Sequence, residues 1–370
     1  MKLKSVHIRN FKGVKEVVID FGGPSGPRYL TALLGDNGSG KTTVLQAIAF
    51  VLSLASGRTQ HPDSFNWPGF EWDRISSLGD TSIELVTLYS LEEFYAIHEM
   101  LSDRDAPFPV YINGVRLDQT PREALCLTLG FGNLHPNDRD MGPSPVPTAF
   151  LKYGTVIQGE EPPKRLEGTF PDLGNVYWFD QLRNIGSIRS GPADLKPRGN
   201  GLWGNWASGV QELREILIAW WGVHTSSREE LQPATKLRQL ETLMDKLFQG
   251  TKFAGMEETA YPATTPELSD YFFLLERDGN RYDISEMSSG EQAIFPLLFE
   301  FVRLDMAESS SLVLIDELEL HLHPPEQQAL FRALPIIGPD CQYIITTHSE
   351  VLTDVIPNEW EVRLDKGRVI

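Results

Sequence analysis

The chain has 370 residues, and its 51 Asp and Glu against 33 Lys and Arg give a formal net charge of −18 at pH 7. With 41% hydrophobic and 23% charged residues, the composition is that of a folded globular protein that is long enough to bury a large core. The negative charge argues against a protein that coats DNA or an anionic membrane over its whole surface, although it allows a local basic patch.

The two cysteines, Cys126 and Cys341, are too few for a disulfide framework or a cysteine metal cluster. The first ten residues lack the apolar segment of a secretory signal. The longest apolar run, at residues 47–54, is too short to cross a bilayer. We therefore expect a cytoplasmic protein with no membrane partner.

Apolar periodicity predicts the elements at both ends of the chain. The amino-terminal ones are strands at 5–8, 14–21 and 29–34, a mostly apolar helix at 41–56, a strand at 81–89 and a helix at 91–101. The carboxyl-terminal ones are a helix at 292–304, a buried strand at 311–315, a helix at 325–334 and a buried strand at 342–346.

The middle of the chain has a different character, because Pro and Gly are frequent between residues 103 and 208. Asn113-Gly114 is typical of a hairpin turn. After this stretch we expect helices at 210–221 and 228–248 and a hairpin at 271–283. The prediction is an amino-terminal lobe at 1–100, a loop-rich and helical insert at 101–270, and a carboxyl-terminal lobe at 271–370.

The strongest motif is the run from Gly35 to Thr42, GDNGSGKT, which lies between a predicted strand and a predicted helix. Its glycines let successive backbone N–H groups point toward one bound anion. The amino terminus of the helix that follows carries a partial positive charge, which favours an anionic ligand. Lys41 is expected to reach the β- and γ-phosphates, and Thr42 to offer its hydroxyl to Mg²⁺. The strand and helix on either side disfavour an ordinary glycine-rich turn. The expected nucleotide contacts are Asn37, Gly38, Ser39, Gly40, Lys41, Thr42 and Thr43.

A second motif is the apolar strand that ends in Asp316 and Glu317. Asp316, at the carboxyl end of the strand, is suited to hold Mg²⁺, and Glu317 can polarise an attacking water. Apolar strands that end in two acids also occur as plain strand-to-loop transitions. The phosphate-binding motif favours the catalytic interpretation.

Two further motifs are weaker alone. Met287 to Gln292, MSSGEQ, precedes a predicted helix, and a serine helix cap explains it as well as a functional role does. His348 follows the strand predicted at 342–346, where its imidazole could bond a γ-phosphate.

Together the four motifs resemble an ABC-type ATPase head of the SMC, RecF and OLD branch. The run from Ile315 to Pro324, IDELELHLHP, is similar to that of AAA_21-like ATPases in bacterial anti-phage defence systems of the PARIS, retron and Septu types. The run from Ile8 to Gly13 also resembles the amino-terminal strand and turn of that branch. The resemblance implies an α/β P-loop NTPase with a mixed central sheet, an amino-terminal antiparallel β-subdomain and a mid-chain insert.

The resemblance also implies roles. Residues 35–42 are the Walker A loop, and Asp316 and Glu317 are Walker B with its catalytic glutamate. Ser288, Gly290 and Glu291 fall in the signature motif, which has Met for Leu, Ser for the first Gly and Glu for Gln. The signature serine contacts the γ-phosphate bound by the opposite subunit, and His348 is the switch histidine. ATP with Mg²⁺, held by Thr42 and Asp316, would then join a homodimer or a larger homo-oligomer.

Three positions stay open. The Q-loop glutamine is either Gln60 or lies at residues 72–79. His321 and His323 with nearby Glu319 and Glu326 could ligate zinc, but the family text favours a D-loop at residues 320–323, and spacing specifies no third ligand. Residues 181–198 carry a net charge of +3 that could contact nucleic acid, although a solvated loop is favoured.

Two functions compete. The first is an ATPase sensor or scaffold that holds a separately encoded effector, such as a nuclease, and releases or activates it when a phage component is detected. The alternative is an ATP-gated DNA-binding head of RecF type in DNA repair. The net charge and the absence of heptad arms favour the first. We expect no nuclease in this chain, because no Toprim-like text follows residue 356, and we disfavour a transporter subunit because the motifs are those of the SMC-like branch.

Overall fold

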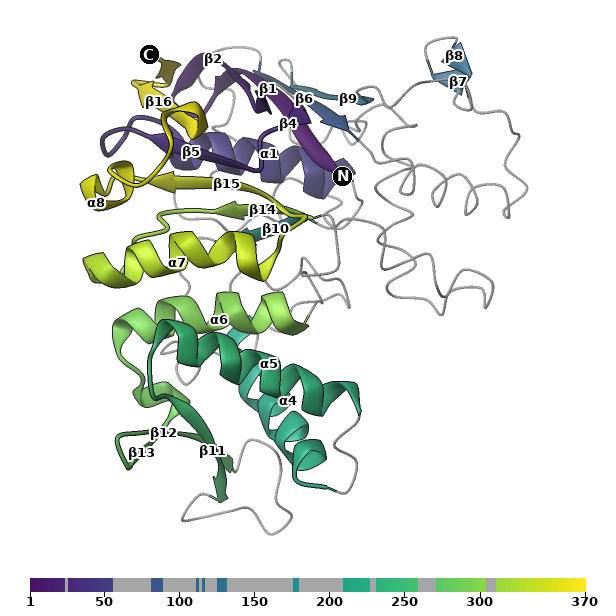
Figure 1. Cartoon of the computed structure of the whole chain (residues 1–370). Coiled ribbons are helices and arrows are strands. Elements are labelled where there is room, and N and C mark those ends of the chain that lie inside the picture. The colour runs from purple at the N-terminus through teal and green to yellow at the C-terminus, as the bar shows by residue number, and fades with distance from the viewer. Residues whose placement is uncertain are drawn as a thin grey trace.

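The computed structural model describes residues 1–23, 26–55, 81–88, 111–112, 115–116, 125–131, 176–179, 209–226, 231–258, 271–303 and 311–370. The statements on structure below concern these residues. Figure 1 shows a layered molecule with two sheets at the top and a mostly helical lobe at the bottom.

A six-stranded sheet forms the centre, in the order β10-β14-β15-β5-β16-β17. Its strands are β5 (Leu30–Leu34), β10 (Val176–Phe179), β14 (Leu312–Ile315), β15 (Gln342–Thr347), β16 (Glu361–Asp365) and β17 (Arg368–Val369). All neighbours are parallel except β16 and β17. Continuous burial of β5, β14 and β15 is typical of parallel strands covered on both faces. The carboxyl ends of the parallel strands therefore meet at one edge.

A second, antiparallel sheet has the order β2-β1-β6-β9. Its strands are β1 (Lys2–Phe11), β2 (Val14–Asp20), β6 (Thr81–Leu88) and β9 (Leu125–Phe131). Helix α1 (Lys41–Ala55) lies between the two sheets, and its buried residues share one core with both of them. Phe50 of α1 packs on Phe11 with ring centroids 6.1 Å apart. Burial on two sides explains why α1 is apolar almost all round.

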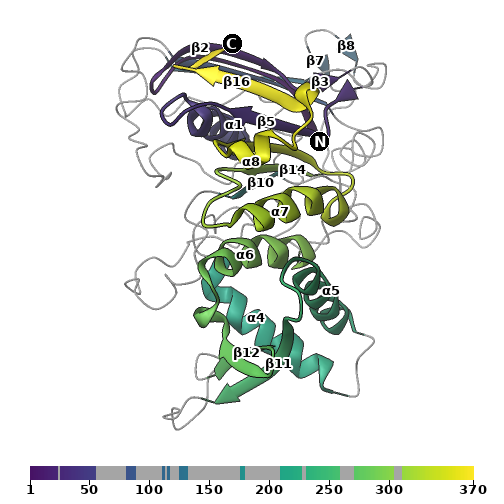
Figure 2. The ribbon, with the colours of Figure 1, turned by 60° about the vertical axis from the view of Figure 1, so that its left-hand side comes forward.

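The lower lobe continues the core on the other face of the central sheet. It consists of α4 (Gly209–His224), α5 (Gln232–Leu247), β11 (Lys252–Glu258), β12 (Tyr271–Arg277), β13 (Asn280–Asp283), the 3-10 turn η7 (Ile284–Glu286) and α6 (Ser289–Arg303). Helix α7 (Pro324–Ile337) lies between α6 and the sheet (Figures 1 and 2). One hydrophobic cluster runs from Tyr343 of β15 to Leu217 of α4 and Phe273 of β12.

The remaining elements are short. They are β3 (Gly22–Gly23) paired with β4 (Gly26–Pro27), β7 (Tyr111–Ile112) paired with β8 (Val115–Arg116), α8 (Glu350–Thr353) and η9 (Asn358–Trp360). No helix in the described ranges has the length and apolar character needed to cross a membrane.

The predicted fold class, with its mixed central sheet and amino-terminal antiparallel sheet, is confirmed. Helix α6 begins at Ser289 instead of 292, and α5 begins at Gln232 instead of 228, because Leu231 is its N-cap and Pro233 stands in its first turn. The helix predicted at 91–101 and the turn at Asn113-Gly114 lie outside the described residues.

Seven strands of the described residues were not predicted: β3, β4, β9, β10, β11, β16 and β17. Three of them, β9, β10 and β11, come from the stretch predicted to be an insert at 101–270. Within it, β9 pairs with β6 and β10 pairs with β14. The division into three regions stays a prediction, but residues from its middle region belong to both large sheets. Strand β16 adds to the free side of β5 and places its hairpin beside the start of α1.

Candidate functional site

The phosphate loop (residues 35–42) joins β5 to α1 and has a backbone shape that favours glycine. Gly35, Gly38 and Gly40 have φ of +150°, +81° and +102°. A Cβ on Gly35 would lie 2.3 Å from the carbonyl oxygen of Leu364 in β16. The backbone N–H of Gly367, in the β16–β17 turn, donates to the Ser39 carbonyl at 2.8 Å. The loop is thus held from behind by the carboxyl-terminal hairpin.

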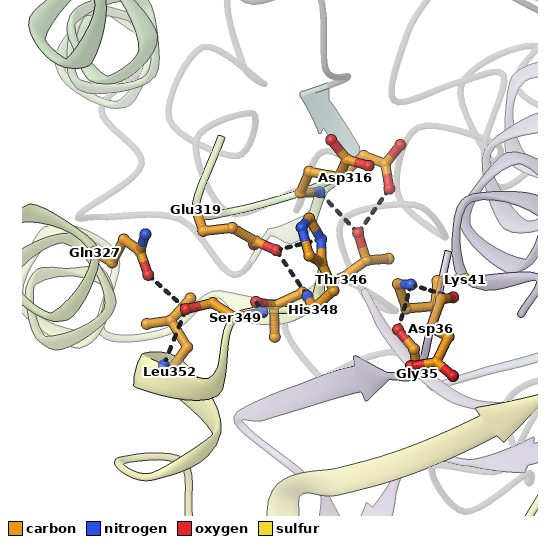
Figure 3. A network of polar contacts seen from close by, with 12 residues as sticks. Gly35, Asp36, Lys41, Asp316, Glu319, Gln327, Thr346, His348, Ser349 and Leu352 are labelled. Atoms are coloured by element: carbon orange, nitrogen blue, oxygen red, sulfur yellow. Dashed lines mark hydrogen bonds and ion pairs between the residues drawn. The ribbon is translucent and has the colours of Figure 1, made fainter. Parts of the chain in front are cut away.

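The side chains of this loop are arranged around its backbone. Lys41 is buried, and its Nζ donates to the carbonyls of Gly35 at 2.7 Å and Asp36 at 3.0 Å (Figure 3). The Ser39 hydroxyl is also buried and has no hydrogen-bond partner. Asn37 and Gly38 are exposed at the tip, and Thr43 is half-buried in the first turn of α1. An ammonium group and an unpaired hydroxyl within a glycine-shaped loop fit an anionic ligand.

Thr42 and Asp316, 274 positions apart in sequence, are in direct contact. The Thr42 Oγ1 lies 3.0 Å from both carboxylate oxygens of Asp316, which is fully buried at the end of β14. Thr346 of β15 donates its hydroxyl to Asp316 Oδ1 at 2.6 Å. A hydroxyl and a carboxylate beside a phosphate loop fit Mg²⁺, which prefers oxygen ligands and usually takes only one or two from protein. The donor set predicted for the metal is therefore assembled.

Glu317 follows Asp316 in a left-handed conformation, with φ of +48°. Its backbone N–H donates to Thr346 Oγ1 at 2.7 Å, which holds this turn against β15. Burial raises the pKa of the Glu317 carboxyl, and the negative charges of Asp316 and Glu319 raise it further, against the opposing charges of His348 and Lys41. Strained backbone and a raised carboxyl pKa are both typical of a catalytic base.

His348 lies just after β15 and contacts Glu319. Its Nδ1 is 2.8 Å from Glu319 Oε1, and its backbone N–H donates to the same oxygen at 2.7 Å (Figure 3). Ser349 donates its hydroxyl to Gln327 Oε1 at 2.6 Å and caps α8. The end of β15 is thereby fastened both to the turn after β14 and to α7.

The predicted signature motif forms a capping box at the start of α6. Ser288 is the N-cap, its N–H and hydroxyl both donate to Glu291 Oε2, and the Glu291 N–H donates back to the Ser288 hydroxyl. Arg277 of β12 pairs with the other oxygen of Glu291, which is buried. A Cβ on Gly290 would lie 2.7 Å from Glu326 Oε2 of α7.

This capping box does not lie at the phosphate loop of its own chain. Figures 1 and 2 show α6 separated from α1 by α7 and the central sheet, although α6 begins on the same side of the molecule as the carboxyl ends of the strands. The structure therefore brings Lys41, Thr42, Asp316, Glu317 and His348 together, and leaves Ser288, Gly290 and Glu291 apart from them.

Residues 320–323 form a turn between β14 and α7. His321 is exposed with φ of +63°, and the His323 N–H donates to Glu326 Oε2 at 3.0 Å as the N-cap of α7. Within the described ranges, no three His, Cys, Asp or Glu side chains gather in a way that could hold a metal ion. The geometry gives the zinc alternative no support.

Two family models and several known proteins match this chain. A family model described as "AAA ATPase domain" matches residues 1–93, and one described as "AAA domain, putative AbiEii toxin, Type IV TA system" matches residues 206–354. The retron Vc95 probable ATPase of Vibrio cholerae serotype O1 biovar El Tor is 32% identical, over 97% of this chain and 72% of that protein. This chain belongs to the same ATPase family. The retron Ec83 probable ATPase of Escherichia coli is 21% identical, over 97% of this chain and 70% of that protein.

A solved structure supports the fold assignment of this ATPase family member. The SmcHead bound to the C-winged helix domain of ScpA matches with a TM-score of 0.55 and 16% identity, over 100% of this chain and 97% of that one. The first family model contains the phosphate loop, and the second contains the capping box, Asp316 and His348. The expected kinship with SMC, RecF and OLD-type ATPases of defence systems is confirmed.

Sequence reasoning missed some residues of this candidate site. Lys12, in the β1–β2 turn, donates its Nζ to Gln46 Oε1 at 2.7 Å; burial lowers the pKa of its ammonium group, and the Asp316 charge opposes this. Thr346 orders Asp316 and Glu317, and Glu319 holds His348. The only sequence feature that pointed to Lys12 was the Phe11-Lys12-Gly13 motif at the β1–β2 turn. The Q-loop candidates (Gln60 and residues 72–79) and the basic stretch 181–198 lie outside the described residues.

Proposed function

We propose that this protein binds ATP with Mg²⁺ at the carboxyl edge of its central sheet, hydrolyses it, and closes into a two-fold dimer around it. The contact between Thr42 and Asp316 carries this proposal, because it joins the phosphate loop to the strand that ends in the candidate catalytic acid. The family membership supports the same chemistry.

Each side chain has a role that follows from its position. Lys41 and the loop amides bind the β- and γ-phosphates, and Thr42 and Asp316 hold Mg²⁺. Mg²⁺ held by Thr42 and Asp316 would supply positive charge to balance the negative charge that develops on the phosphates. Glu317 accepts the proton of the attacking water, for which a raised pKa suits it, and His348 donates a hydrogen bond to the γ-phosphate.

A second copy of the chain completes the site in this proposal. Helix α6, which begins directly after Ser288, is separated from α1 by α7 and the central sheet, but it begins on the same side of the molecule as the carboxyl ends of the strands (Figure 1). Two copies related by a two-fold axis can each offer Ser288 to the other's γ-phosphate. Loss of the γ-phosphate then favours the open pair.

Glu317→Gln tests the ATP-joined dimer. The variant keeps the shape of the side chain but cannot take a proton, so hydrolysis should fall by about 10²–10⁴-fold while ATP binding persists. Light scattering after gel filtration with saturating ATP should show a dimer, and Lys41→Ala should stay monomeric as the non-binding control. A Glu317→Gln protein that binds ATP and remains monomeric would refute the dimer.

A separate experiment tests Thr42 and Asp316 as the proposed Mg²⁺ ligands. Asp316→Asn keeps the hydrogen bond of Thr42 but loses the charge that holds Mg²⁺. Adding EDTA to the native protein should lower ATP affinity, and EDTA should change the affinity of Asp316→Asn much less. Equal sensitivity of both proteins to EDTA would remove Asp316 from the metal site.

We further propose that the cycle controls a separately encoded effector in anti-phage defence and responds to a phage-derived trigger. The similarity to retron ATPases and the net charge of −18, which suits a basic protein partner, support this role. Affinity capture from the native host with the Glu317→Gln protein should retain a neighbouring-gene product that the native protein releases with ATP. ATP-dependent, salt-sensitive DNA binding without such a partner would favour the RecF-type alternative.

A further inference from the structure

Glu319 is a buried carboxylate with an unusual hydrogen-bond pattern. It is 7% exposed, and its Oε1 serves His348 twice, through the backbone N–H at 2.7 Å and through Nδ1 at 2.8 Å. Its Oε2 is buried without a partner. An ionised carboxylate can only accept hydrogen bonds, so the proton in the side-chain contact belongs to Nδ1 of His348. This leaves Nε2 as the nitrogen that can serve another group.

The imidazole needs such a restraint. The His348 side chain is 45% exposed, so packing alone restricts its rotation little. In Figure 3 the ring stands between Glu319 and the group formed by Asp316, Thr346 and Lys41. Holding Nδ1 at Glu319 therefore directs Nε2 away from Glu319, on the side where the proposed nucleotide site lies.

The support of this pair is rigid. The Leu318 N–H donates to the Thr346 carbonyl at 3.0 Å, and the Leu322 N–H donates to the Glu319 carbonyl at 3.0 Å. Glu319 and His348 thus stand on two segments that are bonded to each other beside Asp316.

We propose that Glu319 is a positioning residue for hydrolysis. It accepts from Nδ1–H of His348 in the doubly protonated imidazolium form, so that Nε2–H is offered to the γ-phosphate. The inference rests on the proposed ATPase function. In the step, the water oxygen bonds to the γ-phosphorus, the water proton passes to Glu317, and the bond from that phosphorus to the β–γ bridging oxygen breaks. The Nε2–H of His348 stabilises the charge on the γ-phosphoryl oxygens without being transferred.

The kinetic test compares three variants in single-turnover hydrolysis. Glu319→Ala frees the imidazole, so the rate should fall by about 100-fold, as for the loss of one oriented donor, while ATP affinity stays within about threefold. Glu319→Gln retains an oxygen acceptor and should recover most of the rate. Glu350→Ala removes an exposed carboxylate from the start of α8 and should behave like the native protein.

A double-mutant cycle and an NMR measurement distinguish a loss of His348 orientation from a general loss of structure. If Glu319 acts through His348, Glu319→Ala should add little to the loss already caused by His348→Ala. ¹⁵N NMR of the native protein, with His348 assigned from the His348→Ala spectrum, should show a protonated Nδ1, and Glu319→Ala should lose that form.

Three results would overturn the inference: a native-like rate in Glu319→Ala, multiplicative losses in the double mutant, or an unprotonated Nδ1 in the native protein. Failure of the native protein to bind or hydrolyse ATP would instead overturn the proposed function, and the NMR result would still decide whether Nδ1 is protonated.

Discussion

The phosphate-loop edge and the capping box of α6 are built in opposite ways. At the phosphate-loop edge, Ser39 Oγ and Glu319 Oε2 are buried without hydrogen-bond partners. The backbone of Glu317 is in the left-handed conformation. In the capping box, Ser288 and Glu291 satisfy each other, and Arg277 takes the remaining oxygen. Polar groups without hydrogen-bond partners indicate a ligand-binding site. Polar groups that pair with each other indicate a rigid structural unit, which can contact a partner without rearranging.

Gly35→Ala tests whether the phosphate loop depends on the packing behind it. The new methyl group would lie 2.3 Å from the Leu364 carbonyl oxygen, so the loop has to move. ATP affinity should fall by about 10–100-fold, the equivalent of about 1–3 kcal/mol of backbone strain. Titration with a fluorescent ATP analogue measures it.

Gly279→Ala is the matched control for that variant. Gly279 has φ of +78° in the β12–β13 turn and nothing within 4 Å of a new Cβ, so only the conformational cost of about 1–2 kcal/mol applies. ATP affinity should not change. Equal effects of the two substitutions on ATP binding would mean that the packing behind the phosphate loop is irrelevant.

Arg277→Ala should damage the rigid unit. It leaves the buried Glu291 carboxylate without its charge partner, and because the Arg277 side chain is 32% exposed we expect a loss of about 2–3 kcal/mol, below the range for fully buried pairs. Urea unfolding measures the free energy. Arg281→Ala removes the exposed pair with Glu276 on the same hairpin and should cost about 0.5 kcal/mol or less. Similar losses for both would show that Glu291 does not need its partner.

Ser288→Ala should cost less stability than Arg277→Ala. It removes one helix cap, worth about 1 kcal/mol, and leaves the Arg277–Glu291 pair in place. ATP-dependent dimerisation should nevertheless be lost, since the hydroxyl is the group offered to the partner's nucleotide. Thermal unfolding and light scattering report the two effects separately. If the Ser288→Ala protein is stable and dimerises normally with ATP, the predicted signature motif acts only as a helix cap.

Much of the fold and of the candidate site could be predicted because their signals are local. The phosphate loop is contiguous, and β14 and β15 are unbroken apolar runs. Strand β10, with four residues in a Pro- and Gly-rich stretch, carries too little pattern, and Gly255 interrupts the alternation of β11. The roles of the site residues stay predictions.

The missed site residues are ordinary in sequence and special only in space. Nothing local marks Glu319 as the partner of a histidine 29 positions away, or Arg277 as the partner of a glutamate in the next helix. Long-range charge pairs of this kind depend on how the turns after β14 and β12 are placed, which a pattern of hydrophobicity does not encode.

The position of β5 also affects how the protein is made. β5 ends at residue 34, yet both of its hydrogen-bonded neighbours, β15 and β16, come more than 300 residues later. At synthesis rates of about 5–20 residues per second, roughly 15–65 s pass before these strands leave the ribosome. During that time the apolar strand has two open edges, and its loop lacks the support of Leu364 and Gly367. The phosphate loop therefore gains its full support only after nearly the whole chain described here has been made.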